Sequence, residues 1–264
     1  MTQRTPGWAG TAVILGGLTV LWWLERKRPL RRAVEPGVRR IARNLTVGAL
    51  TAATVSAIER PIVERVAHAA GNRGWGLVPR LPLSSALRTA LAVVLMDYTL
   101  YWWHVLLHRV PVLWRLHAPH HIDRDLDLTT GVRFHALEFL ASIPWRCAQI
   151  VFIGAGPRTL ALWQRLTFME VLFHHSNVRL PRTLENSLSR FIVTPRMHGI
   201  HHSVVRSELD SNFSSGLAIW DTLHGTAHAG VGRDAVTIGL SDHRHARDVT
   251  LGQTLALPFE KWNT

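Results

Sequence analysis

The chain has 264 residues, 47% of them hydrophobic, and a formal net charge of +12. Its single cysteine, Cys147, excludes an internal disulfide framework. The basic excess would suit nucleic acid, but the arginines flank apolar segments and no nucleic-acid-binding motif is present. We therefore expect a membrane protein held against anionic lipid, with no nucleic-acid partner.

The first apolar segment, Trp8 to Leu24, is about long enough to cross a bilayer, and an arginine-rich stretch follows over residues 26–43. By the positive-inside rule that stretch is cytoplasmic, so the first helix runs from outside to inside. Asn44 to Ile58 is short and rich in small residues, which fits a packed membrane helix or a buried helix of a soluble domain equally well. Glycines and prolines over residues 59–83 predict a loop with a short amphipathic piece around Ile62 to Ala69.

The third predicted membrane helix, Leu83 to Leu107, contains the carboxylate of Asp97. A carboxylate within a membrane helix is costly and points to a functional role. Asp97 shares one stripe of the helix with His104 and His108, so we expect it to accept a hydrogen bond from a metal-binding histidine. An ion pair with a neighbouring arginine is the alternative.

Leu137 to Phe173 is a long apolar segment interrupted by Gly-Ala-Gly-Pro at 154–157. Glycine and proline break helices, so this segment predicts a hairpin whose two ends return to the same side. From Ser176 onward we expect the chain to lie outside the membrane. The predicted fold is all-α: a multi-pass integral-membrane helical bundle of about four spanning or hairpin segments, with a histidine-rich helical cap on the cytoplasmic side.

Histidines gather in three clusters with helical spacing: His104 and His108; His117, His120 and His121; His198, His201 and His202. Residues three and four apart lie on one helical face, and neutral imidazole is a common ligand of zinc, copper, iron and nickel. Two or three such helices can enclose a metal pair. One isolated histidine usually belongs to the core, and structural zinc is usually closed by cysteines, so the repetition favours a catalytic metal centre.

Further motifs surround these clusters in a fixed order: D-Y-x-x-Y-W-x-H at 97–104, T-x-x-R-x-H-x-x-E at 130–138, H-S-N at 175–177, T-P-x-x-H-x-x-H-H at 194–202 and W-D-x-L-x-G-T at 220–226. Together they resemble the fatty acid hydroxylase superfamily, also called the sterol desaturase family of integral-membrane di-iron oxygenases. The resemblance covers about half of the chain. It implies a catalytic domain over 83–226, between N-terminal membrane helices with a connecting loop over 1–82 and a C-terminal cytoplasmic tail over 227–264.

The resemblance implies that all eight clustered histidines bind metal. It supplies a further ligand at the end of the hairpin, where His175 matches the H-S-N motif better and His174 is the alternative. It also implies residues that support the ligands without binding metal: Asp97, His135, Glu138, Asn212 and Asp221.

The function implied by the resemblance is hydroxylation or desaturation of a lipid by two iron ions, with dioxygen as co-substrate. The substrate is a fatty acyl chain, a sterol or other isoprenoid lipid, or an alkylglycerol. Electrons are expected from a separate protein, a ferredoxin or a cytochrome with its reductase. Two alternatives remain: a zinc-dependent membrane hydrolase, which the absence of H-E-x-x-H disfavours, and a non-catalytic membrane metal-binding protein, which would carry ionisable residues along several spans.

Overall fold

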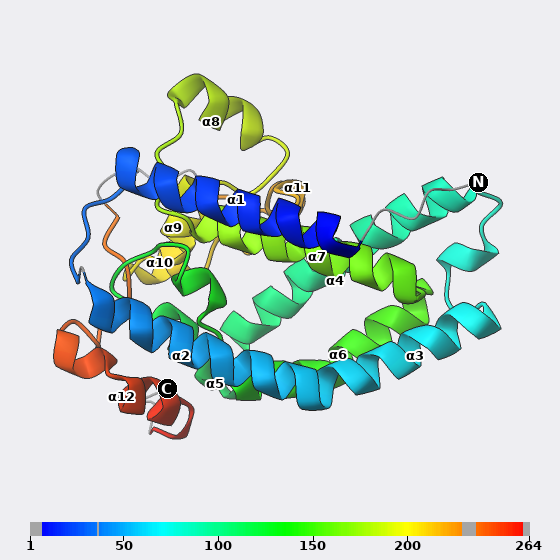
Figure 1. Ribbon diagram of the computed structural model, residues 1–264, viewed down its shortest axis with the longest axis horizontal. Coiled ribbons are helices and arrows are strands. Elements are labelled where there is room, and N and C mark those ends of the chain that lie inside the picture. Colours follow the sequence, from blue (N-terminus) through cyan, green and yellow to red (C-terminus); the bar gives the residue numbers. More distant parts are fainter. Residues whose placement is uncertain (1–6, 36, 229–235, 261–264) are drawn as a thin grey trace.

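The computed structural model describes residues 7–35, 37–228 and 236–260, and its long helices run roughly along the longest axis of the molecule (Figure 1). The long helices are α1 (Gly7–Lys27), α2 (Val38–Thr54), α3 (Arg60–Arg73), α4 (Ser85–Arg109), α6 (Ala136–Ile153) and α7 (Pro157–His175), with a π-helical turn, η1 (Val55–Glu59), between α2 and α3. The short helices are α5 (Pro111–His121), α8 (Arg182–Leu188), α9 (Pro195–His201), α10 (Arg206–Leu209), α11 (Ile219–His224) and α12 (Leu251–Ala256). Single 3-10 turns are η2 (Val78–Arg80), η3 (Thr130–Val132), η4 (Ala246–Val249) and η5 (Leu257–Phe259). In the described residues β-structure is limited to isolated bridges, so the all-α prediction is confirmed.

Within the described residues, three helical segments are long and apolar enough to cross a membrane: Val38–Arg80, Ser85–Arg109 and Ala136–Ile153. Large apolar side chains on these segments, such as Leu50, Ile58 and Phe152, are exposed on the protein surface and suit contact with lipid. Helix α1 covers the predicted segment Trp8 to Leu24 but is not among the three.

The predicted loop over residues 59–83 is correct only in part. Helix α2 continues through η1 into α3, which contains the amphipathic piece expected around Ile62 to Ala69, and a connection without α-helix follows over residues 74–84. Pro61 directly follows the wider turn η1 in this continuous helix, and its missing N–H leaves one bond to that turn unmade. Gly71 lies where α3 approaches α7, and a Cβ there would stand 3.4 Å from Pro157. The helix ends at Gly74, whose φ of +61° is left-handed.

The predicted hairpin is confirmed, because α6 and α7 meet at the Gly-Pro segment. Gly154 ends α6 with a φ of +88°, and Pro157 opens α7. The connection from α3 to α4 closes onto this turn, since Leu77 N donates to Phe152 O at 2.9 Å. A Cβ on Gly154 would stand 2.3 Å from Trp75 O, so only glycine fits this approach.

One buried apolar cluster fills the half of the bundle near this turn, where α3, α4, α6 and α7 meet. It includes Ala67, Met96, Ile150 and Trp163. The opposite half of the bundle carries the histidines and is covered by the short helices (Figure 1).

The C-terminal segment packs over the histidine end. Leu240, Val249 and Leu257 share a buried cluster with Ala118 and Ile122 at the end of α5. Parts of the predicted tail, residues 229–235 and 261–264, lie outside the described residues.

Candidate metal centre

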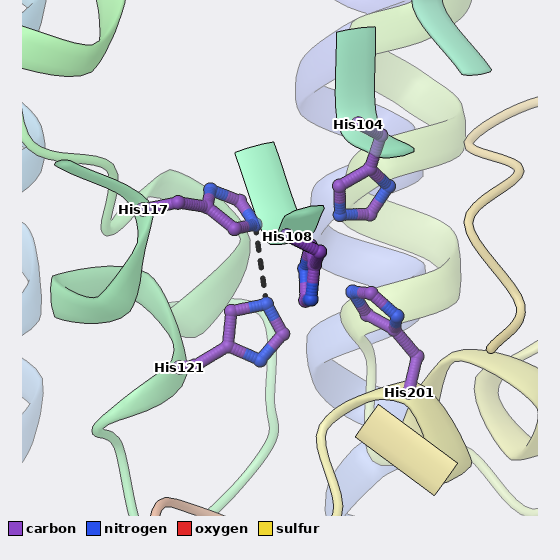
Figure 2. Close-up of side chains that lie close together, drawn as sticks. All are labelled: His104, His108, His117, His121 and His201. Atoms are coloured by element: carbon purple, nitrogen blue, oxygen red, sulfur yellow. Dashed lines mark hydrogen bonds between the residues drawn. The ribbon is translucent and has the colours of Figure 1, made fainter. Parts of the chain in front are cut away.

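Nine buried histidines meet at this end of the bundle in two groups, each of which could hold a metal ion. In each group the potential ligand atoms all lie within 4.8 Å of one another. The first group comes from α4, α5 and α9 and comprises His104, His108, His117, His121 and His201 (Figure 2). The second comes from α5, α7 and the end of α9 and comprises His120, His175, His198 and His202.

Neighbouring positions on one helix separate into different groups. His120 and His121 differ by about 100° around the helix axis. His121 therefore belongs to the first group, whereas His120 belongs to the second. The groups nevertheless adjoin, because the rings of His121 and His202 stack with centroids 4.1 Å apart.

Backbone carbonyls and one carboxylate fix the orientation of several rings. Nδ1 lies at hydrogen-bond distance from these acceptors: His104 to Phe213 O at 2.7 Å, His120 to Arg133 O at 3.3 Å, His175 to Val171 O at 2.8 Å, His201 to Ser211 O at 2.8 Å and His117 to Glu138 Oε2 at 3.0 Å. Oxygen atoms of this kind only accept, so Nδ1 carries the proton and a neutral ring presents the lone pair of Nε2. Bonds of this kind orient an imidazole so that it can bind a metal ion.

Because the proton of each ring is on Nδ1, the Nε2 atoms of neighbouring rings face one another without a proton between them. Nε2 of His120 lies 2.9 Å from Nε2 of His175, although both rings donate through Nδ1. Burial lowers the pKa of His120 well below its ordinary value, which disfavours an imidazolium at this position. Two facing lone pairs repel, and a cation between them removes the repulsion. The donor set therefore fits a bound metal ion.

Unbonded nitrogens in the first group support the same conclusion. Within the described residues, both ring nitrogens of His108 and Nε2 of His201 are buried without a hydrogen-bond partner. A buried nitrogen without a partner is unfavourable unless a ligand satisfies it, and a metal ion would do so.

His174 and His175 occupy different positions, although they are adjacent. The ring nitrogen of His175 belongs to the second group, whereas His174 is outside both groups. The ring of His174 packs against that of His198, with centroids 4.0 Å apart. The geometry thus favours His175 as the ligand and His174 as its neighbour.

Asp97 has different partners from those expected. Its Oδ2 accepts from Trp220 Nε1 at 2.7 Å and from the Leu217 backbone N–H at 3.0 Å. It therefore ties α4 to the segment around α11 rather than orienting a histidine. The reason is axial position, since Asp97 lies about two turns before His104 and faces α11 instead of α5.

Asp221 supports His104 through the backbone. Its carboxylate accepts from the N–H groups of Phe213 and Ser214 at 2.8 and 3.0 Å, and from Thr226 Oγ1 at 2.7 Å. Because the carbonyl of Phe213 is the acceptor of His104, Asp221 fixes the position of that acceptor.

Asn212 and His135 brace the backbone in other places. Asn212 has a left-handed φ of 49°, and its side chain donates to Met197 O on α9 and to His228 O, each at 3.0 Å. His135 was expected to support a ligand, but its Nδ1 accepts from Leu137 N at 3.2 Å and so caps α6.

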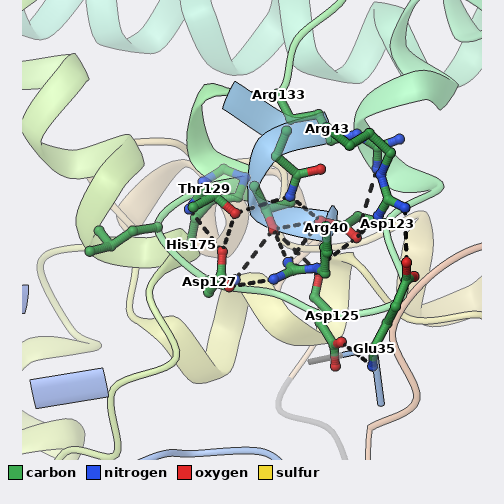
Figure 3. A network of polar contacts seen from close by, with 12 residues as sticks. Glu35, Arg40, Arg43, Asp123, Asp125, Asp127, Thr129, Arg133 and His175 are labelled. Carbon is green, nitrogen blue, oxygen red and sulfur yellow. Dashed lines mark hydrogen bonds and ion pairs between the residues drawn. The ribbon is translucent and has the colours of Figure 1, made fainter. Parts of the chain in front are cut away.

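A buried ion network beneath the second group was not anticipated from the sequence (Figure 3). Asp123 is fully buried and accepts from Arg40 at 2.8 Å and from Asn44 at 2.8 Å. Arg133, whose carbonyl accepts from His120, lies within the same network, with Nη1 3.9 Å from Asp123. Burial alone would raise the pKa of Asp123, but Arg40 and Arg133 hold it well below its ordinary value.

This network changes the interpretation of the basic stretch at 26–43. Arg40 and Arg43 are buried and paired with Asp123, so they join α2 to the segment after α5. The exposed cations that remain for a membrane surface are Arg26, Lys27, Arg28, Arg32 and Arg39.

A cavity of about 710 Å³ extends from the histidines into the bundle, between α2, α4, α6 and α7. His104, His120 and His175 line it, and its walls are mainly apolar, with Trp103 and Val171 among the lining residues. An apolar ligand of considerable length can therefore reach the histidine groups from within the bundle.

A family model described as fatty acid hydroxylase matches residues 89–226, just over half of the chain. An ornithine lipid hydroxylase of Rhizobium tropici is 35% identical over 158 residues, 59% of this chain and 46% of the relative. Human alkylglycerol monooxygenase is 28% identical over 56% of this chain and 32% of the relative, and human lathosterol oxidase is 28% identical over 49% and 41%. The matched region thus spans less than half the length of each of these relatives. No solved structure matches the chain.

Proposed function

Because the chain belongs to the fatty acid hydroxylase family, we propose that it is a membrane-bound di-iron oxygenase that hydroxylates or desaturates a lipid. The observation that carries this proposal is the meeting of two histidine groups with the inner end of a long apolar cavity. Such a site would place a hydrocarbon chain beside the residues that would hold the metal ions.

The first histidine group would hold one iron and the second group the other, with His174 beside the second site. When bound, the iron pair supplies the dioxygen activation needed to break an unactivated C–H bond. The protein's own contribution is orientation. The carbonyls of Phe213, Arg133 and Val171 and the carboxylate of Glu138 keep each Nε2 directed inward.

The substrate would lie in the cavity with a hydrocarbon segment beside His104 and His120. The relatives include an ornithine lipid hydroxylase, an alkylglycerol monooxygenase and a lathosterol oxidase. By analogy, the proposed substrates are an acyl lipid, an alkylglycerol or a sterol. Hydroxylation and desaturation begin with the same hydrogen abstraction.

The histidine end of the bundle is proposed to face the cytoplasm. The exposed cations Arg26, Lys27 and Arg28 lie at the end of α1 that packs near the histidine region, since Arg28 O accepts from Arg179 N. The positive-inside rule places such a flank on the cytoplasmic side.

A separate electron donor is proposed to bind where a second cavity, of about 440 Å³, reaches His108 from the surface. Arg109, Arg115 and Arg206 line this cavity, and the guanidinium group of Arg206 lies over the ring of Trp114. A basic rim around a metal-binding histidine suits an acidic ferredoxin or cytochrome.

Labelled dioxygen tests the proposal. Purified protein with a matched donor system should consume dioxygen and modify a membrane lipid, and hydroxylation should place the label in the product. Iron close to two atoms per chain is expected. Tightly bound zinc with no iron after iron-replete expression, or turnover without dioxygen, would contradict the proposal.

A further inference from the structure

An ion pair lies inside the cavity, at a distance from the histidines. Arg146 on α6 and Glu59 at the end of η1 both line the cavity, and Arg146 Nε lies 2.8 Å from Glu59 Oε1. Both residues belong to segments apolar enough to span a membrane. Ionisable groups at such positions are costly, occur mainly in pairs and mark functional sites.

The position of this pair is fixed relative to the metal centre by α6. Glu138, which contacts His117, lies eight residues before Arg146 on the same helix, so the pair is about 12 Å farther along the bundle. The cavity therefore has histidines at one end and an ion pair at some distance along it.

The π-helical turn places Glu59 at the cavity. Residues Val55–Glu59 form η1, the wider turn that often marks functional sites in helices. Val55, Ser56 and Glu59 all line the cavity from this turn. An acidic side chain thus enters the cavity from a helix whose outer face is apolar.

One oxygen of this carboxylate is available. Glu59 is only 4% exposed, and within the described residues its Oε2 has no hydrogen-bond partner. The Arg146 guanidinium lies over the Trp163 ring, 5.2 Å from its centroid, which holds the cation in place. A buried carboxylate oxygen only accepts, so it needs a donor from the cavity.

We propose that the Glu59–Arg146 pair binds the polar group of the lipid, through a hydroxyl or amide N–H that donates to Glu59 Oε2. The inference rests on the proposed function in one respect: the remainder of the lipid then extends toward the iron site. The carbon that is oxidised must then lie far along the lipid from the hydroxyl or amide group that binds Glu59. A lipid that is oxidised next to its own hydroxyl group cannot reach both the ion pair and the iron site.

Binding, measured without turnover, tests this site. The chain purified in detergent would first be loaded with tritiated hexadecanol. The bound radioactive alcohol would then be displaced with unlabelled hexadecanol or with hexadecyl methyl ether, which has no hydroxyl hydrogen to donate. A hydrogen bond to a charged acceptor predicts that the alcohol binds about 10-fold tighter or more. N-Hexadecylacetamide and its N-methyl derivative form a second pair, which distinguishes an amide from a hydroxyl site.

A double variant tests whether the preference for the donating probe comes from the Glu59–Arg146 pair. Glu59→Leu with Arg146→Leu removes both charges together, and replacing a buried ion pair by apolar side chains is generally tolerated. This variant should bind alcohol and ether equally, with ether affinity close to that of the wild type. The control, Arg247→Leu with Asp248→Leu, removes a 3.8 Å pair outside the cavity and should keep the preference.

Equal binding of donor and methylated probes by the wild-type protein would overturn the inference, and this comparison needs no variant. Retention of the preference in the folded double variant would overturn it as well. The binding assay does not depend on turnover. If the protein prefers the donating probe but does not use dioxygen, the binding site is supported and the proposed function is rejected.

Discussion

At the residue scale, the candidate site depends on the acceptor behind each imidazole as much as on the imidazole. His104 and His201 direct Nδ1 at the carbonyls of Phe213 and Ser211, and their rings meet with centroids 4.5 Å apart. Since the acceptors are backbone atoms, these rings are positioned by the path of the chain. Removal of a ligand and removal of a support should therefore have effects of different size.

Alanine at a proposed ligand should abolish product. His120→Ala or His201→Ala removes one nitrogen from a group whose donors lie within 4.8 Å of one another, so iron should fall below two atoms per chain. Lipid product and iron content measure the effect. His68→Ala, outside both groups and outside both cavities, should match the wild type. Full turnover in the double variant of His120 and His201 would exclude these groups as the catalytic centre.

Loss of the carboxylate behind His117 should be milder. Glu138→Ala removes the acceptor of Nδ1, and such losses typically lower metal affinity or activity by about 10- to 100-fold. Glu138→Gln can still accept through its amide oxygen, so it should retain more iron. Iron retained after timed exposure to a chelator is the measurement. Equal retention by Glu138→Ala and the wild type would show that Glu138 does not support the ligand.

At the element scale, helices are joined to the histidine region by buried polar contacts. Helix α2 is tied by Arg40 and Asn44 to Asp123 in the segment after α5. Helix α4 is tied by Asp97 to Trp220 and Leu217 around α11. Apolar packing of long helices permits sliding and rotation, whereas these directional bonds fix how the helices meet. The register of the bundle and the geometry of the site are therefore coupled.

Breaking the network around Asp123 should destabilise the protein strongly. Asp123→Ala leaves Arg40 buried without its main partner, and removal of one member of a buried pair typically costs about 3–5 kcal/mol. Thermal unfolding in detergent, followed by circular dichroism, should show a clear fall in Tm. Asp127→Ala, which removes a partly exposed partner of the same arginine, should lower Tm less. Similar Tm values for both variants and the wild type would contradict this account.

At the scale of the whole molecule, the two ends of the bundle differ in character. One end holds the histidines, the basic cavity and the short helices, and the other holds the apolar turn between α6 and α7. Exposed residues are present at both ends, including Val205 near the histidines and Leu77 beside the turn. The proposed orientation in the membrane can therefore be tested from either side.

Cysteine labelling of intact cells should separate the two ends. On a Cys147→Ser background, Leu77→Cys should react with an impermeant reagent added outside, and Val205→Cys should react only after permeabilisation. The expectation follows from exposed cations at the histidine end of α1. Labelling of Val205→Cys from outside intact cells would reverse the proposed orientation.

Charge reversal at the second cavity should impair electron delivery. Arg115→Glu and Arg206→Glu remove basic charge from the rim that reaches His108, so the KM for an acidic donor protein should rise and its salt dependence should weaken. Steady-state assays at several ionic strengths measure both, and iron content should stay at the wild-type level. An unchanged KM in both variants would place the donor on another face.

The amino-acid sequence alone was sufficient to predict an all-α class, the hairpin at 154–157 and the histidines at the site, because apolar blocks, helix breakers and ligand spacing are local properties of a chain. It was misleading in part over residues 60–73, where Pro61 and Gly71 lie within α3 instead of a loop. Only the tertiary structure decided that His120 and His121 belong to different groups, and that Asp97 holds Trp220 rather than a histidine. The carbonyl acceptors and the contact between Arg40 and Asp123 were equally out of reach, because backbone oxygens carry no residue signature and the Arg40–Asp123 contact joins positions far apart in the chain.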